Sequence, residues 1–275
     1  MSNSIFGLEG KSALVIGGGQ GMGESTVMQL VNAGCNVAVL DLEMSRAEAV
    51  AAKVKAAGRK SMAISVNVLD DAALKDAIAK VDKEMGGLDA MASIIGMAGW
   101  SRLVDMTEAS WDMDQNRNLR YFFIAAREVA KSMMARKRPG SIVCITSIDG
   151  VRSAPYHASY GAAKAGLISL VKSMSIEWGE AGIRVNAVAP GAIVTPRIPM
   201  RPGEMERAMT KGVPMARRGT TDDIGKAALF FLSAQSSYVT GQTLAVDGGY
   251  LAASLLDYAA IINSMEPGGT LGVKS

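Results

Sequence analysis

The sequence predicts a single α/β domain, a doubly wound sheet of seven parallel strands with helices on both faces. Short apolar, β-branched runs alternate with helical patterns of ten to fifteen residues, as βαβ units require. The first run is followed by a glycine-rich turn and then by a helix. The 275 residues, 49% of them hydrophobic, contain no repeat, low-complexity run or long linker that would mark a second domain.

Each strand is placed by a short apolar run that ends in glycine, proline or a polar residue. The predicted strands cover residues 12–16, 36–40, 61–68, 88–95, 141–146, 184–189 and 242–246. Apolar residues at helical spacing predict the intervening helices. These helices cover roughly residues 23–33, 45–57, 71–84, 107–137, 158–178 and 220–232.

The glycine turn after the first strand predicts a dinucleotide site. Gly17, Gly21 and Gly23 permit a tight turn and let a pyrophosphate approach the backbone at a helix N-terminus. Asp41 ends the second strand, where a carboxylate accepts hydrogen bonds from ribose hydroxyls and repels a 2′-phosphate. No lysine or arginine lies in the turn or directly after Asp41, so the sequence favours NAD over NADP. Taken singly, the turn also fits an ordinary loop, and Asp41 also fits a helix N-cap.

Tyr160 and Lys164 form the candidate catalytic pair. They lie four residues apart in a predicted helix, so their side chains share one face. A phenol has an ordinary pKa of about 10, and a nearby ammonium is expected to lower it. Ser147 ends the fifth strand, where its hydroxyl can hold a substrate oxygen beside the tyrosine. Such a group removes a proton from an alcohol or delivers one to a ketone, although the spacing alone also describes an ordinary helix-surface pair.

Composition excludes several other classes of protein. The net charge of +3 comes without a cluster of basic residues, which argues against a nucleic-acid surface. No run of eighteen apolar residues predicts a membrane span, and the N-terminus lacks a signal-peptide pattern. Cys35 and Cys144 lie in or beside predicted strands and are interpreted as core residues of a cytoplasmic protein. No metal site is predicted.

Together, the motifs resemble the short-chain dehydrogenase/reductase superfamily, in its compact subfamily, over roughly residues 8–250. The glycine turn matches the cofactor motif of that family, and Tyr160 and Lys164 match its catalytic pair. Ser147 falls at its catalytic serine, and Asn118 matches the asparagine that completes its tetrad. The segment 186–195 matches the stretch that contacts nicotinamide.

The resemblance implies a Rossmann-type fold and an NAD(H)-dependent oxidoreductase that acts on CH–OH groups. Tyr160 would act as acid and base, while Lys164 would lower its pKa and hold the nicotinamide ribose. Ser147 would stabilise the substrate oxygen, and Asn118 would position a water in a proton relay. The implied cofactor-binding residues are Gly17, Gly19, Gln20, Gly21, Met22, Gly23, Asp41, Leu42, Asn67, Val68, Gly96, Tyr160, Lys164, Pro190, Gly191, Ile193 and Thr195.

Three positions depart from the family pattern. Ile16 replaces a threonine, and the segment 93–96 reads Ser-Ile-Ile-Gly instead of Asn-Asn-Ala-Gly. Those two family segments are hydrogen-bonded neighbours, and replacing both partners by apolar groups can be nearly neutral. The prediction is therefore that Ile16 packs near Ser93 or Ile94. Asn67 replaces an aspartate that holds the adenine amino group, and an amide oxygen can still accept that bond.

The substrate side is predicted from family position. The bordering residues would be Met97, Trp100, Asp149, Tyr156, His157 and Met200. Residues 196–215, rich in proline, methionine and charge, are interpreted as a mobile lid. Because methionine adapts to irregular apolar shapes, the predicted substrate is a bulky, mainly apolar secondary alcohol or ketone, such as a steroid, terpenoid or aryl carbinol. The methionines can equally fill core gaps, His157 fits an exposed cap-region histidine, and Asp149 fits bonds to loop backbone alone.

Two further alternatives stay open. Residues 251–275 extend past the domain and are apolar enough to need a partner surface. They either cover the substrate pocket or contact a neighbouring subunit of a homotetramer, which is the favoured interpretation. The rival activity is a 3-oxoacyl-thioester reductase, against which Asp41 argues because such reductases usually use NADPH. The remote alternative is a non-catalytic dinucleotide-binding regulator, against which the complete tetrad argues.

Overall fold

The computed structural model describes residues 5–254 and contains the predicted doubly wound sheet. Seven strands pair in parallel in the order β3-β2-β1-β4-β5-β6-β7. The fold class predicted from the sequence is therefore confirmed. The strands are β1 Ser12–Ile16, β2 Asn36–Asp41, β3 Ser61–Ser65, β4 Ala90–Ser93, β5 Gly140–Ile145, β6 Ile183–Pro190 and β7 Thr243–Val246.

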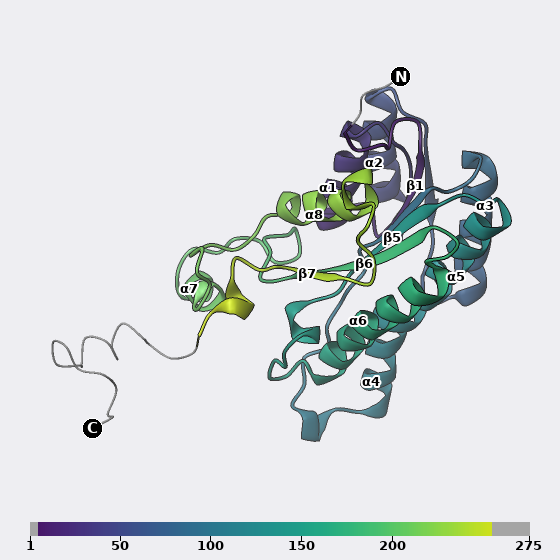
Figure 1. The fold of residues 1–275 in the computed structure, drawn as a ribbon. Coiled ribbons are helices and arrows are strands. Elements are labelled where there is room, and N and C mark those ends of the chain that lie inside the picture. The colour runs from purple at the N-terminus through teal and green to yellow at the C-terminus, as the bar shows by residue number, and fades with distance from the viewer. Residues whose placement is uncertain (1–4, 255–275) are drawn as a thin grey trace, which may run out of the picture.

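Helices cover both faces of the sheet (Figure 1). They are α1 Gly21–Asn32, α2 Met44–Ala56, α3 Asp71–Met85, α4 Glu108–Gln115, α5 Tyr121–Ala135, α6 Ala158–Trp178, α7 Glu204–Thr210 and α8 Thr221–Leu232. Apolar side chains of α1, α2 and α8 pack with one face of the sheet in one core cluster. Those of α3, α5 and α6 pack with the other face in a second cluster.

Strand β1 shows why the strands are apolar throughout. Its side chains alternate between the two faces, so Leu14 and Ile16 join the α3–α5–α6 cluster while Ala13 and Val15 join the other. All four are fully buried. A parallel sheet covered on both faces needs such continuous apolar strands, which explains why short apolar runs sufficed to locate them.

The order of the strands reverses between β1 and β4, which are direct neighbours in the sheet. Open α/β sheets bind ligands at this switch point, outside the carboxyl ends of the strands. The loops that follow β1, β4, β5 and β6 carry Gly17, Gly96, Ser147 and Gly191. The fold therefore gathers the predicted site residues at one edge of the sheet.

The helix predicted over residues 107–137 differs from the prediction in its middle. Between α4 and α5 the backbone forms a wide π turn over Asn116–Arg120. Such a turn holds one residue more than the α-helical repeat and is frequent at functional sites. Asn118 lies inside this turn and is fully buried. The third and fourth strands are also shorter than predicted, and the segment 196–215 contains the helix α7.

The predicted contact between Ile16 and Ser93 is confirmed. The two residues are paired across β1 and β4, and both are fully buried. The Ser93 hydroxyl is not orphaned, because its oxygen lies 2.8 Å from the phenolic oxygen of Tyr121. Tyr121 in turn donates to the carbonyl of Ile95 at 3.2 Å. Ser93 therefore has Tyr121 as its polar neighbour, in place of the threonine that the family has at position 16.

The chain beyond the domain is described only to Ser254, after a 3-10 turn at Tyr250–Ala252. Most of the 251–275 extension, with the predictions made for it, lies outside the described residues. Among residues 5–254, no helix combines the length and hydropathy that a membrane crossing requires.

Candidate active site

A cavity of about 650 Å³ runs along the carboxyl edge of the sheet. It extends from Asp41, the last residue of β2, to Ser147, Tyr160 and Lys164 beside β5. Of the predicted cofactor residues, it is lined by Gly17, Gln20, Gly21, Met22, Asp41, Leu42, Asn67, Val68, Gly96, Tyr160, Lys164, Pro190, Gly191, Ile193 and Thr195. Predicted dinucleotide and catalytic groups thus share one continuous space.

The backbone of the glycine turn has a shape that lets a ligand approach it closely. Gly17 and Gly21 have φ values of +79° and +60°, which L-residues with side chains rarely adopt. A Cβ atom on Gly23 would lie 1.8 Å from the carbonyl oxygen of Gly17, so only glycine fits there. Gln20, the N-cap of α1, makes no side-chain capping bond in the described structure. The Gly23 amide donates to the Gln20 carbonyl at 3.1 Å. The amides of Gly21 and Met22 are those that could bind an anion, so the turn fits a dinucleotide pyrophosphate.

Asp41 is fixed at the end of the cavity that is predicted to hold the adenosine. Its Oδ2 accepts a hydrogen bond from the Gly19 amide at 2.9 Å, and its Oδ1 accepts one from the Glu43 amide at 3.2 Å. Arg46 also lies here, with Nη1 4.0 Å from Asp41 Oδ1. The sequence argument found no cation directly after Asp41 and overlooked this one, because the start of α2 turns the chain back toward β2. The acidic end of the cavity therefore contains an arginine as well.

Tyr160 is partly buried, and its phenol lies near the hydroxyl of Ser147, which favours the phenolate. Ser147 accepts a hydrogen bond from the Asp149 amide at 3.1 Å, which orients its hydroxyl. Burial raises the pKa of Tyr160 to about 12, the hydroxyl of Ser147 opposes that rise, and the carboxylates of Asp149 and Asp114 add to it. The phenol therefore carries its proton at neutral pH and is suited to donate it.

Lys164 forms hydrogen bonds with two backbone carbonyls. Its Nζ donates to the carbonyls of Ile145 at 2.9 Å and Ile95 at 3.3 Å, and lies 5.5 Å from the centre of the Tyr160 ring. Burial lowers the pKa of Lys164 itself to about 8. Lys164 is not among the groups that shift the pKa of Tyr160 here, where burial is the largest cause, so the predicted lowering by Lys164 stays a prediction. The lysine ties together the ends of β4 and β5.

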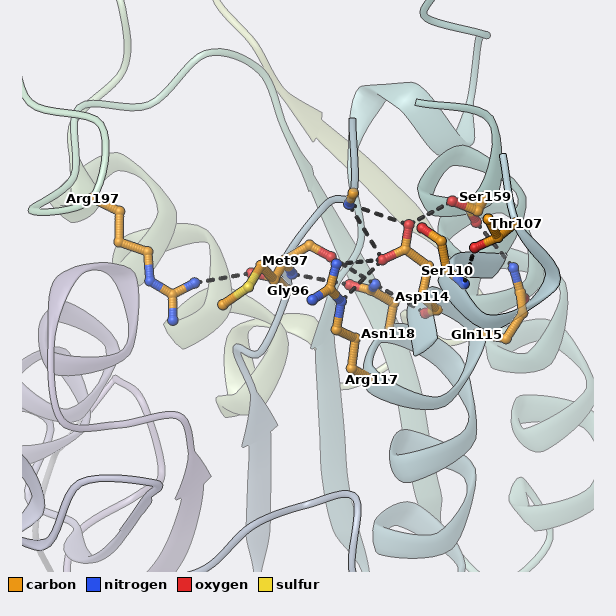
Figure 2. Close-up of polar contacts among 11 residues, drawn as sticks. Gly96, Met97, Thr107, Ser110, Asp114, Gln115, Arg117, Asn118, Ser159 and Arg197 are labelled. Carbon is orange, nitrogen blue, oxygen red and sulfur yellow. Dashed lines mark hydrogen bonds and ion pairs between the residues drawn. The ribbon is translucent and has the colours of Figure 1, made fainter. Parts of the chain in front are cut away.

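Asn118 is tied to the loop after β4 (Figure 2). Its Oδ1 accepts from the Met97 amide at 3.2 Å, and its Nδ2 donates to the carbonyls of Met97 at 2.9 Å and Asp114 at 3.0 Å. Asn118 lies behind the cavity wall rather than among the lining residues. Its role in a water relay stays a prediction, while its contacts show that it fixes the position of Met97.

Asp114 is the centre of a buried polar network that the sequence did not indicate (Figure 2). Its side chain is fully buried and accepts from Arg117 Nη2 at 2.6 Å and from the hydroxyl of Ser159. Both of its oxygens also accept from the Gly99 amide, at 3.2 and 3.3 Å. The carboxylate thus joins α4, the loop after β4 and the residue before Tyr160.

His157 lies inside the site and is not an exposed cap residue. Its Nδ1 is 2.9 Å from Asp149 Oδ2, and its side chain is only 13% exposed. The ring contacts that of Trp100 at a tilt of 53°, with centroids 3.7 Å apart, and lies 5.5 Å from the ring of Tyr160. The alternative in which Asp149 bonds only to loop backbone is therefore wrong as well. Sequence reasoning treated the two residues separately and missed that they form a pair.

The residues predicted to border the substrate fall into two groups, those that line the cavity and those that do not. Met97, Trp100, Asp149 and His157 line the cavity, whereas Tyr156 and Met200 do not. Tyr156 is 57% exposed and Met200 61% exposed. Lining residues that the sequence reasoning missed include Arg46, Met113, Arg117 and Arg197. Met113 and Arg117 are four residues apart, a spacing that places side chains on one helix face. That spacing could have predicted that both residues line the cavity.

Arg197 crosses the cavity from the predicted lid. Its Nη1 donates to the carbonyl of Gly96 at 3.3 Å, so the segment after β6 is joined to the loop after β4 (Figure 2). Within the described chain, no group of three or more histidine, cysteine or acidic residues is arranged to hold a metal ion.

Comparisons with known proteins fit this geometry. Residues 17–251 match a family model described as enoyl-(acyl carrier protein) reductase. The chain is 38% identical over 240 residues to the 3-oxoacyl-[acyl-carrier-protein] reductase FabG of Staphylococcus aureus, covering 87% of this chain and 97% of that protein. It is 33% identical over 250 residues to a short-chain dehydrogenase/reductase of Armillaria gallica, covering 88% of this chain and 96% of that protein.

Solved structures give the same picture. A 7α-hydroxysteroid dehydrogenase, complexed with NADH and 7-oxo glycochenodeoxycholic acid, superposes with a TM-score of 0.85 at 31% identity. That match covers 90% of this chain and 97% of the dehydrogenase. A putative short-chain alcohol dehydrogenase from Sinorhizobium meliloti 1021 also gives a TM-score of 0.85, at 32% identity, covering 91% of this chain and all of that one.

Proposed function

We propose that this chain, which belongs to the short-chain dehydrogenase/reductase superfamily, transfers a hydride between NAD and a bulky, mainly apolar secondary alcohol or ketone. The observation that carries the proposal is the single cavity that joins Asp41 to Ser147, Tyr160 and Lys164. In such a cavity, a redox cofactor and a proton-transferring phenol would both reach one substrate carbon and its oxygen.

In the direction of ketone reduction, Tyr160 donates its phenolic proton to the substrate oxygen, and Ser147 holds that oxygen by a hydrogen bond. A nicotinamide cofactor held along the glycine turn and Asp41 would supply the hydride, so that the carbonyl would gain one hydride and one proton. The raised pKa of Tyr160, about 12, keeps the proton available at neutral pH. Lys164 keeps the loops after β4 and β5 in register around the reacting group, and solvent replaces the proton afterwards.

The preference for NAD rests on Asp41. Its carboxylate is held at the end of β2 by two backbone amides, and a 2′-phosphate placed beside it would be repelled. Arg46 lies 4.0 Å away and is a cation that can offset this repulsion. Cofactor choice is therefore a balance between these two side chains, within the part of the chain that the structure describes.

Asp41→Asn should shift cofactor use toward NADP+. The ratio of kcat/KM for NADP+ to that for NAD+ is expected to rise roughly 10- to 100-fold, because a repulsive charge disappears while Arg46 stays. Adding Arg46→Ala to Asp41→Asn should remove most of that rise. Steady-state kinetics with both cofactors measures the ratio. An unchanged ratio in Asp41→Asn would contradict the assignment of Asp41 to the ribose.

A second candidate is a 3-oxoacyl-thioester reductase. It is supported by the 38% identity to FabG over nearly the full length of that protein. The position of Arg46 in the cavity also favours it, because such reductases usually use NADPH.

One panel of substrates separates the two candidates. NAD+ reduction would be followed by absorbance across steroid, terpenoid and aryl carbinols and 3-hydroxyacyl thioesters, with NADP+ in parallel. Turnover of a bulky apolar alcohol with NAD+ supports the proposed function. Turnover confined to hydroxyacyl thioesters, or faster with NADP+, supports the reductase instead. A chain that turns over no alcohol in the panel is not the proposed dehydrogenase.

We further infer a homotetramer located in the cytoplasm. Exposed apolar side chains support the assembly, namely Trp111 on α4, Phe123 on α5 and Ile176 on α6. These helices lie beside one another on the same side of the sheet (Figure 1). Apolar residues on adjacent helices suit a surface that a second copy of the chain covers. Cys35 and Cys144, both free and buried, suit a reducing compartment.

A further inference from the structure

Two contacts hold the imidazole of His157 in place. Asp149 Oδ2 lies 2.9 Å from Nδ1 on one edge of the ring, and the tilted ring of Trp100 contacts it at 3.7 Å between centroids. An ionised carboxylate only accepts hydrogen bonds, so Nδ1 carries the proton in this contact. The neutral ring then presents a lone pair on Nε2. The orientation and the tautomer of His157 are therefore both fixed.

The Nε2 atom has no partner. It is buried, and the residues that the structure describes offer it no hydrogen bond. A buried polar atom without a partner is unfavourable and calls for an explanation. His157 lines the same cavity as Ser147 and Tyr160, so a bound substrate is the available source of a donor.

We propose that His157 Nε2 accepts a hydrogen bond from a second hydroxyl group on the substrate. The inference rests on the proposed function and narrows its substrate class to alcohols with a largely apolar body and two neighbouring oxygens. The rings of His157 and Tyr160 are 5.5 Å apart between centroids, so the second hydroxyl belongs on a carbon close to the reacting one. Tyr160 and Ser147 bind the oxygen that reacts, and His157 binds the oxygen that does not.

A chain of contacts joins the two halves of this arrangement. The Asp149 amide donates to Ser147 Oγ at 3.1 Å, while the Asp149 side chain holds His157. One short loop therefore sets the distance between the group that binds the reacting oxygen and the group that binds the second. Specificity for the spacing of two oxygens follows from that loop, because a site built around a substrate hydroxyl discriminates strongly against analogues that lack it.

The test uses two aryl carbinols as probes, 1-phenylethane-1,2-diol and 1-phenylethanol, which differ only in the second hydroxyl. In the wild-type enzyme with NAD+, kcat/KM for the diol should exceed that for the mono-alcohol by about 10- to 100-fold. His157→Phe should bring this ratio close to one. His157→Gln should keep part of it, because an amide oxygen can accept the same bond.

Asp149→Asn is the matched variant. Its amide can turn an N–H toward Nδ1, which moves the imidazole proton to Nε2 and converts the acceptor into a donor. The diol preference should fall although both side chains keep their shape, and the Asp149 backbone contact to Ser147 persists. An effect on the ratio in this variant would not come from a role of His157 in packing alone.

Two results would overturn the proposal. One is a diol preference in His157→Phe equal to that of the wild type, and the other is a wild-type enzyme without preference. Failure of the proposed function can be told apart from failure of the role of His157, because in the first case neither probe is oxidised by any form of the protein. In that case, quenching of tryptophan fluorescence by the corresponding hydroxyketone and ketone, in the presence of NADH, still measures the ratio of affinities. Equal ratios in wild type and His157→Phe would again reject the role of His157.

Discussion

Replacing Tyr160 with phenylalanine is expected to lower kcat for alcohol oxidation by about 10²- to 10⁴-fold, the range that a lost general acid or base usually causes. Phenylalanine fills the same buried space beside Ser147 but has no proton to exchange. Binding of NAD+ should stay intact, because the ring still packs where the phenol did. Initial rates of NADH formation measure the first effect, and titration calorimetry with NAD+ measures the second.

Tyr121→Phe is the matched control for that experiment. Tyr121 is a fully buried tyrosine, and its hydroxyl contacts Ser93 and the Ile95 carbonyl rather than the predicted catalytic serine. Loss of those bonds should cost about 1–3 kcal/mol of stability through the groups left unpaired, with a far smaller effect on kcat. If Tyr160→Phe kept turnover comparable to this control, Tyr160 would not be the acid. If biological function survived without turnover, the chain would be a dinucleotide-binding regulator.

Replacing Asp114 with alanine is expected to lower the free energy of unfolding by about 2–4 kcal/mol, since it removes one member of a buried charge pair and leaves several donors unpaired. The donors are Arg117, the hydroxyl of Ser159 and the Gly99 amide. Arg117 keeps some access to water, with 22% of its side chain exposed, which places the loss below that of a fully buried pair. Turnover should fall as well, because Ser159 directly precedes Tyr160.

Urea unfolding, followed by circular dichroism, measures this loss, and Asp112→Ala provides the comparison. Asp112 lies on the same short helix but is exposed. A surface substitution of that kind usually changes stability by no more than about 0.5 kcal/mol. Equal losses in the two variants would mean that helix α4, rather than the network around Asp114, was responsible.

The sheet could be predicted because its causes are local. An apolar run such as residues 12–16 is needed wherever a strand is covered on both faces, and the run is visible without any knowledge of its neighbours. The glycine turn and the Tyr160–Lys164 spacing are also local. Pairing of Ile16 with Ser93 followed from two replacements that only make sense together, and the register of β1 and β4 confirms it.

The rest depends on contacts between distant segments. His157 and Asp149 are eight residues apart, and Asp114 and Ser159 are forty-five apart, so no periodicity relates them. The pKa of Tyr160 was predicted from one neighbour, whereas burial, a property of the whole fold, sets its direction. Arg46 was overlooked because only immediate neighbours of Asp41 were considered. Side-chain pairs and electrostatics therefore emerge only when the elements are packed together.

The π turn at Asn116–Arg120 bears on how this chain can change in length during evolution. An α-helix turns by about 100° per residue, so a deletion within α5 would rotate every later side chain off its buried face. A one-residue deletion inside the π turn would instead restore a regular helix and leave both flanking faces in place. Such a deletion would displace Asn118 and break its hydrogen bonds with Met97. This is a point where a lineage could lose one residue, keep the fold and lose the site.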